Sequence, residues 1–295
     1  MEHRVFGLRN FSVLVLVLSG LGLAGGYLGV LHPLGDSLSV GRVYAVVGVL
    51  AAAVMASLAG MQRTSFAALL LGLLSGLQVF MVSNLPGPPG RLVLYQKNLR
   101  FDNTLLPVLE ADIRAAAPVL LTVQELSDAN RVLMDNLSDL LPSQTRCPGE
   151  SVGGTAVASQ WPMVEGSAIC APGLAAMQVR PPESEPFWLV SIHLHWPYPY
   201  RQADHVAELL PVLAGLQGKV VLAGDFNMLR WGHSVRQIAD AVRVEAAGPM
   251  IGTYTGFAPW ALLGIDHVFA PQGGRVVARG RLGSDHLGLL AGLEL

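Results

Sequence analysis

The stretch Val220 to Leu229, VVLAGDFNML, is the strongest indicator of the fold. Its first four residues are apolar and predict a short buried strand, and Gly224 then lets the backbone turn tightly. Asp225 and Asn227 follow on either side of Phe226, so their side chains point the same way. A carboxylate beside a carboxamide can orient a water molecule and bind a phosphoryl oxygen. The alternative is an ordinary strand-to-loop turn, because Asp and Asn are common turn residues.

Polar side chains stand at the ends of several other apolar segments after residue 90. Such residues suit a sheet core poorly, because burying an unpaired charge or amide is costly. At one rim of a sheet they would instead assemble a polar site in a cleft. The residues placed in this way are Asn98 in LVLYQKN, Glu125 in VLLTVQE, His193 and His195 in WLVSIHLH, Asp266 in GIDHVF, and Asp285 and His286 in GSDHLGLL.

Residues 1–85 have the composition of a membrane anchor. The chain of 295 residues is 52% hydrophobic and only 14% charged, and its mean hydropathy is +0.46. Three runs without charge, 11–31, 43–60 and 66–82, have about the length of a helix that crosses a bilayer, roughly 20 residues. We therefore expect three retained transmembrane helices. The alternatives are a cleaved signal peptide for the first run, or a buried hydrophobic hairpin in a soluble fold.

Basic residues near these runs indicate the orientation of the anchor. Arg4 and Arg9 precede the first run, Arg42 lies in the first loop and Arg63 in the second. The positive-inside rule then favours a cytoplasmic N-terminus, with Arg63 also inside. Three spans place the two ends of the chain on opposite sides, so we expect a multi-pass protein of the cell membrane whose residues after 85 are extracytoplasmic.

The sequence PGPPG at 86–90 predicts a stiff linker between the anchor, 1–85, and a catalytic domain, 91–295. After the linker, segments with strand character alternate with amphipathic segments, which is typical of an α/β fold. We expect strands at 92–98, 119–125, 153–159, 166–170, 175–179, 187–195, 220–223, 265–270 and 288–293, and helices at 103–117, 127–141, 202–216 and 234–244.

The charge of the domain bears on the kind of partner it binds, and its two cysteines bear on the redox state of its compartment. From residue 91 onward, 15 Lys and Arg stand against 19 Asp and Glu, which makes nucleic acid a poor partner because affinity for a polyanion rests on clustered cations. Cys147 and Cys170 flank a segment that reads as neighbouring strands. They are either buried thiols of a reducing compartment or a disulfide of an oxidising one.

Together these motifs resemble the endonuclease/exonuclease/phosphatase superfamily, the DNase I-like metal-dependent phosphodiesterases and phosphatases. The resemblance runs from about residue 92 to 295, and its motifs occur in the order of the family. It implies a four-layer α/β sandwich with two mostly antiparallel sheets and the site at one edge between them. The matching pieces are Asn98, the QE of Gln124 and Glu125, the HL of His193 and Leu194, GDFN at 224–227, IDH at 265–267 and SDH at 284–286.

The resemblance, with the chemistry of the residues, implies a metal site. Glu125 would be the main ligand of a divalent ion, with Asn98 and Asp285 near the same ion. Few carboxylates combined with waters and phosphate oxygens suit Mg²⁺, with Mn²⁺ as the alternative. Such a centre would help to stabilise the transition state for hydrolysis of a P–O bond.

The remaining motif residues would act on the water and the phosphate. Asp225 would orient or deprotonate the attacking water, and Asn227 would hydrogen-bond the phosphoryl group as charge builds on it. His286, paired with Asp266, would contact a phosphate oxygen as an imidazolium. His193 would be a second phosphate contact or a proton donor.

Two further histidines have weaker claims to a function. His195 shares a face with His193 but does not clearly match the family pattern. His267, inside IDH, is interpreted as a packed or rim residue.

The fold alone does not name the substrate, because this superfamily acts on DNA, sphingomyelin, inositol phosphates and other phosphoesters. An acidic domain tethered outside a membrane is better placed for a lipid or lipid-linked phosphoester. Aromatic residues near the site would suit a bilayer interface, or simply pack the strand ends: Trp196, Tyr198, Tyr200, Tyr254, Phe257 and Trp260.

The architecture of three spans plus this domain also resembles bacterial membrane proteins of the teicoplanin-resistance type, which implies a cell-envelope precursor as substrate and a link to glycopeptide resistance. The alternatives are a surface nuclease and a catalytically idle binding domain.

Overall fold

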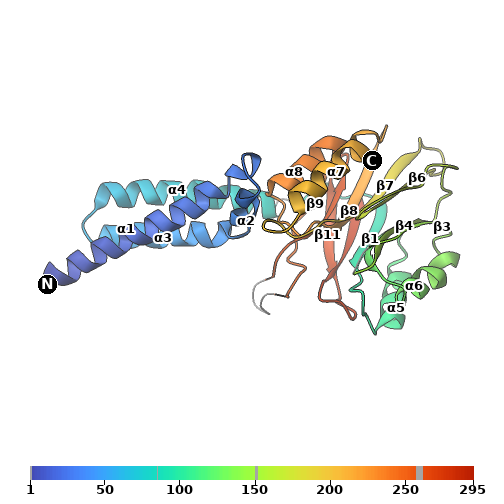
Figure 1. Cartoon of the computed structure of the whole chain (residues 1–295), viewed down its shortest axis with the longest axis horizontal. Helices are drawn as coiled ribbons and strands as arrows, with labels where there is room; N and C mark the ends of the chain where they lie inside the picture. Colours follow the sequence, from blue (N-terminus) through green and yellow to red (C-terminus); the bar gives the residue numbers. More distant parts are fainter. Residues whose placement is uncertain (1, 85, 150–151, 257–261) are drawn as a thin grey trace.

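Long helices form the N-terminal region, coloured blue to cyan in Figure 1. The computed structural model describes residues 2–295 apart from 85, 150–151 and 257–261. In the described region, α1 (Glu2–Gly25) packs on α3 (Arg42–Leu58), and α3 packs on α4 (Gln62–Asn84). The 3₁₀ turn η1 (Leu28–Val30) and the short α2 (Leu34–Val40) lie at the end that faces the rest of the molecule.

Two of these helices have the length and composition of membrane spans. They are Phe6–Gly25 within α1 and Gln62–Asn84, and the pair α2 and α3, bent by 66° at the break, would make a third span if counted as one. The expectation of three spans therefore holds as two or three. The first helix ends at Gly25 and not at residue 31, because the chain folds back through η1 into α2.

Twelve strands follow, within the described part of the chain. Most of their residues are apolar and few are charged, as is typical of buried strands. The strands are β1 (Leu92–Asn98), β2 (Leu120–Leu126), β3 (Ser143–Cys147), β4 (Gly154–Ser159), β5 (Ile169–Ala171), β6 (Leu174–Val179), β7 (Phe187–His193), β8 (Val220–Asp225), β9 (Glu245–Gly248), β10 (Asp266–Ala270), β11 (Gly274–Arg279) and β12 (Gly288–Leu293).

These strands form one continuous ladder, in the order β3-β4-β2-β1-β12-β11-β9-β10-β8-β7-β6-β5. Most neighbours are antiparallel; β1 with β2, β7 with β8 and β9 with β11 are parallel. The expectation of two separate sheets is thus corrected. The short β9 pairs with β10 on one side and with β11 on the other, and so joins the two halves.

The ladder folds over so that its halves face each other between two layers of helices. Residues such as Leu94, Val157, Leu189 and Val221 fill the space between the halves. The helices α7 (Gln202–Ala214) and α8 (His233–Val242) cover the half with β7 and β8, whereas α5 (Leu106–Ala116), α6 (Arg131–Asn136) and the turn η2 (Leu137–Asp139) cover the half with β1 and β2. The layering is therefore that of a four-layer α/β arrangement.

A disulfide closes the ladder. Cys147 of β3 is bonded to Cys170 of β5, and these strands are the two ends of the strand order. The question that the sequence left open is thereby answered in favour of a disulfide, which is the state expected in an oxidising compartment.

We expect thiol labelling of the unreduced, denatured protein to find no free cysteine. The Cys147→Ala/Cys170→Ala variant should unfold at a lower temperature, because the bond spans 23 residues and a loop of that size is worth about 3 kcal/mol in the unfolded chain. Labelling of both thiols in unreduced protein would contradict the bond.

Candidate active site

The strand-terminal residues of the motifs meet at one rim of the folded ladder. Three of them share a register: His193 of β7 and Asp266 of β10 each lie opposite Asp225 of β8. Glu125 of β2 reaches the same rim through a shift of register between Val123 and Leu126. Irregularities of this kind redirect a side chain. Glu125 and Asn227 also have φ angles of 55° and 48°, which non-glycine residues adopt at a cost and mainly at functional sites.

Asn98 joins the two carboxylates that face the cleft. Its Nδ2 donates to Glu125 Oε1 at 3.0 Å and to Asp225 Oδ2 at 2.9 Å, and its Oδ1 accepts from the backbone N–H of Arg100 at 2.9 Å. The second oxygen of Glu125 accepts from the backbone N–H of Phe101 at 3.0 Å. The carboxylate oxygens of Glu125 and Asp225 are ligands of the kind that Mg²⁺ and Mn²⁺ prefer, whereas Asn98 directs its Nδ2 toward them and its Oδ1 toward the backbone.

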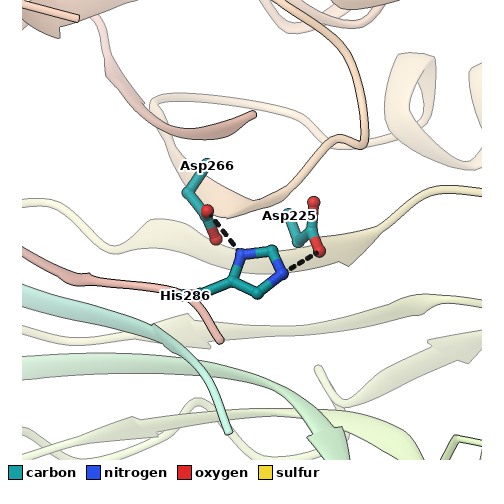
Figure 2. A group of neighbouring side chains, drawn as sticks. All are labelled: Asp225, Asp266 and His286. Atoms are coloured by element: carbon teal, nitrogen blue, oxygen red, sulfur yellow. Dashed lines mark hydrogen bonds and ion pairs between the residues drawn. The ribbon is translucent and has the colours of Figure 1, made fainter. Parts of the chain in front are cut away.

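Asp225, Asp266 and His286 form a second, buried group (Figure 2). His286 Nδ1 lies 2.8 Å from Asp266 Oδ2, and His286 Nε2 lies 3.6 Å from Asp225 Oδ2. The three residues are close enough together to hold a metal ion. However, Asp266 already accepts hydrogen bonds from Gln96, Thr253 and His286, which makes it a better partner for an imidazolium than for an ion.

The charges of this group follow from burial and pairing. Burial alone would lower the pKa of His286, but the carboxylates of Asp266 and Asp225 outweigh it and raise the pKa to about 9. Burial raises the pKa of Asp225 above its usual range, even though His286 opposes the shift. Burial alone would raise the pKa of Asp266 as well, but the pairing of Asp266 with His286 outweighs burial, and the pKa of Asp266 is lowered. An imidazolium thus lies between two carboxylates, of which Asp225 holds a proton more readily.

We expect the stability of the protein to fall in mildly alkaline solution because of this pair. The pKa of His286 is raised above its unfolded value, so its contribution is complete below about pH 6.5 and is lost as pH rises through about 9. The loss is on the order of 3 kcal/mol. It can be measured as the Tm of the full-length protein in detergent from pH 6 to 10. His286→Gln should flatten this slope, and an unchanged slope in that variant would contradict the assignment.

His193 and Asn227 complete the rim. His193 Nε2 lies 3.7 Å from Asp225 Oδ2, and burial lowers the pKa of His193 to about 4. A neutral ring can donate a hydrogen bond to phosphate, whereas it is a poor acid, so this favours the phosphate contact over the proton donor. The Nδ2 of Asn227 donates to Leu194 O at 2.7 Å. An amide has two N–H bonds, and the second suits a phosphoryl oxygen.

The site opens into a cleft of about 660 Å³. Of the predicted site residues, Glu125, His193, Asp225, Asn227, Asp285 and His286 line the cleft, and no lysine or arginine is among the described residues that line it. The remaining lining is mostly small, apolar or aromatic, and comprises Pro148, Gly149, Val152, Gly153, Gly154, Thr155, Cys170, Ala171, Pro172, Gly173, Leu194, His195, Trp196, Tyr200, His205 and Tyr254.

The structure brings all eight predicted site residues to this rim. Asn98, Glu125 and Asp225 are hydrogen-bonded, His193 and His286 flank Asp225, and Asp285 lines the cleft beside them. Of the weaker candidates, His195 lines the cleft, and His267 is buried with its Nε2 2.9 Å from Met228 O. Phe257 and Trp260 lie outside the described residues. The catalytic roles remain predictions.

A buried polar network behind the rim was not predicted from the sequence. Gln96 Nε2 donates to Gln124 Oε1 at 2.8 Å and to Asp266 Oδ1 at 3.0 Å, and Gln124 Nε2 donates to Ser191 Oγ at 2.9 Å. Thr253 donates to the other oxygen of Asp266. The network connects both halves of the ladder and fixes Asp266. The polar run of Gln96 to Asn98 inside a buried strand was the signal that could have revealed it.

Lys97 holds the segment that carries Asp285 and His286. The side chain is fully buried, and its Nζ donates to Arg281 O at 2.7 Å and to His286 O at 2.5 Å. Backbone carbonyls therefore compensate this buried cation.

The layered fold and a rim of carboxylates, amides and histidines at its strand ends define a class: the phosphoester hydrolases, whose chemistry in this fold typically depends on a metal ion. The chain belongs to the endonuclease/exonuclease/phosphatase family, whose profile matches residues 98–286. No curated protein matches the chain.

Solved structures agree with this fold. An endonuclease/exonuclease/phosphatase from Beutenbergia cavernae superposes with a TM-score of 0.56 at 20% identity, over 68% of this chain and 71% of that one. A beta toxin variant from Staphylococcus aureus with bound magnesium ions gives 0.51 at 12% identity, over 69% and 100%. The catalytic domain of human nocturnin, with a bound sulfate anion, gives 0.51 at 15% identity, over 70% and 94%. At these identities the likeness concerns the fold alone.

Proposed function

We propose that this protein is a membrane-anchored, Mg²⁺-dependent phosphohydrolase that cleaves a lipid or lipid-linked phosphoester. The observation that carries the proposal is the make-up and position of the cleft: Glu125, Asp225 and the cationic His286 line it, and the loop that supplies Trp196 and Tyr200 to it contacts the membrane anchor through Tyr198.

The residues divide into a metal set and a phosphate set. Glu125, Asn98 and Asp285 would hold the ion, which supplies a Lewis acid for a phosphoryl oxygen when it is bound. Asp225, whose pKa is raised by burial, orients the attacking water and can accept its proton. Asn227 and the neutral His193 donate hydrogen bonds to phosphoryl oxygens, and His286 presents its positive charge to the phosphate while Asp266 holds the ring.

The loop after β7 supports a substrate that lies at the membrane. Trp196 and Tyr200 of this loop line the cleft. Between them, Tyr198 touches the anchor: its carbonyl accepts from Ser37 Oγ at 2.6 Å, and its ring lies 5.6 Å from the ring of His32. The mouth of the cleft is thus close to the outer ends of the helices, where aromatic side chains suit the interface.

The described lining of the cleft argues against a polyanionic substrate. It contains no lysine or arginine that could follow a nucleic-acid backbone. A single phosphoester attached to a neutral or apolar group fits the Gly, Pro and aromatic lining better.

We place the catalytic domain outside the cytoplasm. Arg4, Arg9 and Arg63 favour this orientation, and the disulfide of Cys147 and Cys170 is the state expected in an oxidising compartment. In the structure the N-terminus and the turn between α3 and α4 lie at the end of the helices remote from the catalytic domain. A lipid-linked precursor of the cell envelope, with its link to glycopeptide resistance, is then the first substrate to test.

The test is the release of phosphate or headgroup by the purified full-length protein from phospholipids, polyprenyl phosphates and plasmid DNA, each with Mg²⁺, Mn²⁺ or EDTA. We expect turnover of a lipid that EDTA abolishes. Asp225→Asn should lose it, whereas Asp240→Asn, an exposed carboxylate at the end of α8, should keep it. Turnover of DNA alone would establish the nuclease alternative. No turnover of any substrate by folded protein would favour the idle binding domain.

A further inference from the structure

The loop between α1 and α3 enters the catalytic domain with a buried carboxylate. Asp36 of α2 is 8% exposed, and its Oδ1 and Oδ2 accept from the backbone N–H groups of His233 and Ser234 at 2.6 and 2.9 Å. These groups belong to the first turn of α8, whose N-cap residue is Gly232 and provides no side-chain cap. The membrane anchor thus supplies the cap that the catalytic domain lacks.

The anchor loop is built to present this carboxylate. Trp231 Nε1 donates to Ser39 O at 2.8 Å, so the neighbouring turn of α2 is also fixed to the segment before α8. Gly29 of η1 lies so close that a Cβ there would come within 2.7 Å of Asp36 Oδ1 and 2.9 Å of His233 Cβ.

A chain of hydrogen bonds continues from Asp36 to the catalytic turn. Ser234 Oγ lies within hydrogen-bond distance of Asp36 Oδ2 and 2.9 Å from Gln202 Oε1, so these two acceptors share its single proton. Gln202, at the start of α7 and 1% exposed, donates from Nε2 to His195 O at 2.7 Å and to Phe226 O at 3.0 Å. Phe226 stands between Asp225 and Asn227 in the sequence.

We propose that Asp36 is a positioning residue for the active site: through Ser234 and Gln202, the membrane anchor sets the backbone that carries Asp225 and Asn227. The catalytic groups on this turn act through their placement, and small displacements of such groups cost rate and leave ground-state binding nearly intact. The inference rests on the hydrolase function proposed above, but its consequence for the order of the turn can be measured without turnover.

The experiment uses the full-length protein in detergent, with the variants Asp36→Ala, Asp36→Asn and Ser234→Ala. For bis(p-nitrophenyl) phosphate with Mg²⁺ we expect Asp36→Ala to lower kcat about tenfold, with KM changed less than about twofold. Asp36→Asn should lie between, because the amide keeps one acceptor for His233 but cannot accept from both N–H groups. Asp240→Ala, at the far end of α8, is the matched control.

Hydrogen exchange tests the same chain of hydrogen bonds without a measurement of activity. Amides of 194–202 and 226–229 should exchange about tenfold faster in Asp36→Ala, while β3 and β4 keep their wild-type rates. The Asp36→Ala/Ser234→Ala double variant should resemble the single variants, because both break one chain.

Three outcomes would overturn the proposal: unchanged exchange at 226–229, additive effects of the two substitutions, or faster exchange in all segments together, which would indicate loss of overall stability only. If the wild type hydrolyses no phosphoester, the hydrolase function fails, and the exchange data still decide the role of Asp36.

Discussion

Replacing Glu125 by glutamine is expected to lower metal-dependent phosphoester hydrolysis by about a thousandfold, which corresponds to about 4 kcal/mol of lost transition-state stabilisation. Glutamine has nearly the same shape and keeps an oxygen for the N–H of Phe101, but it loses the oxygen that accepts from Asn98. What it removes is the negative charge that a divalent ion requires. Initial rates at saturating Mg²⁺ measure the effect, and titration calorimetry with Mg²⁺ should show weaker binding.

Glu245→Gln is the matched control, because Glu245 is an exposed carboxylate on β9, remote from the motif residues in sequence. It should keep the rate and the Mg²⁺ affinity of the wild type. If Glu125→Gln retained both as well, the metal would have to bind elsewhere, and the group of Asp225, Asp266 and His286 would become the candidate.

Replacing His286 by glutamine is expected to reduce kcat by roughly 10²- to 10³-fold, because the phosphate loses a buried positive charge in a site shielded from water. The pH profile provides the specific signature. With its pKa raised to about 9, the imidazolium of the wild type is retained at neutral pH, and activity should decline as pH rises through about 9.

Asp266→Asn tests the cause of this decline of activity at alkaline pH, the alkaline limb of the pH profile. Without the Asp266 carboxylate, which accepts from Nδ1 at 2.8 Å, the pKa of His286 should fall and the decline should begin at lower pH. Asp112→Asn, which breaks an ion pair with Arg279 outside the cleft, should leave the limb in place. An alkaline limb at the same pH in Asp266→Asn would assign it to another group.

The rim could be predicted from the sequence because strand ends are local features. A buried strand followed by a polar residue gives both the element and the placement of the side chain, as for Asp225 after β8 and Asn98 at the end of β1. The folded ladder then brings such strand ends together at one rim. The left-handed backbone of Glu125 and Asn227 leaves no mark in the sequence, because neither position is a glycine.

The single ladder could not be predicted, because it depends on β9 and β11. The segment Glu245–Gly248 has four residues and no run of large apolar side chains, and in β11 only Gly274 and Val276 are buried, whereas Arg275, Val277 and Ala278 are exposed. Two pairs of partners connect β9 to each neighbour, and no periodicity reports so short a contact. Whether Cys147 and Cys170 are bonded could not be decided from the sequence for the same reason, since only the completed ladder places β3 beside β5.

The role of the anchor loop was also beyond the sequence. Asp36 counted there as one acidic residue between two apolar runs, and Arg42 as one basic residue for the orientation of the helices. In the structure Arg42 is buried, donates to Gly26 O at 2.7 Å and lies over the ring of Tyr27. Contacts between residues separated by some 200 positions, such as Asp36 with Ser234, have no signature in local pattern.

The PGPPG linker lies against the ladder: a Cβ at Gly87 would meet the carbonyl of Gly274 at 2.0 Å, and one at Gly90 the carbonyl of Leu293 at 2.0 Å. The helices are therefore attached to the domain at two places, through this linker and through the contacts of Asp36 with the start of α8. In the proposed membrane-bound state, this docking would hold the cleft at one height above the lipid surface. The protein would then reach those phosphates that a headgroup presents at that height.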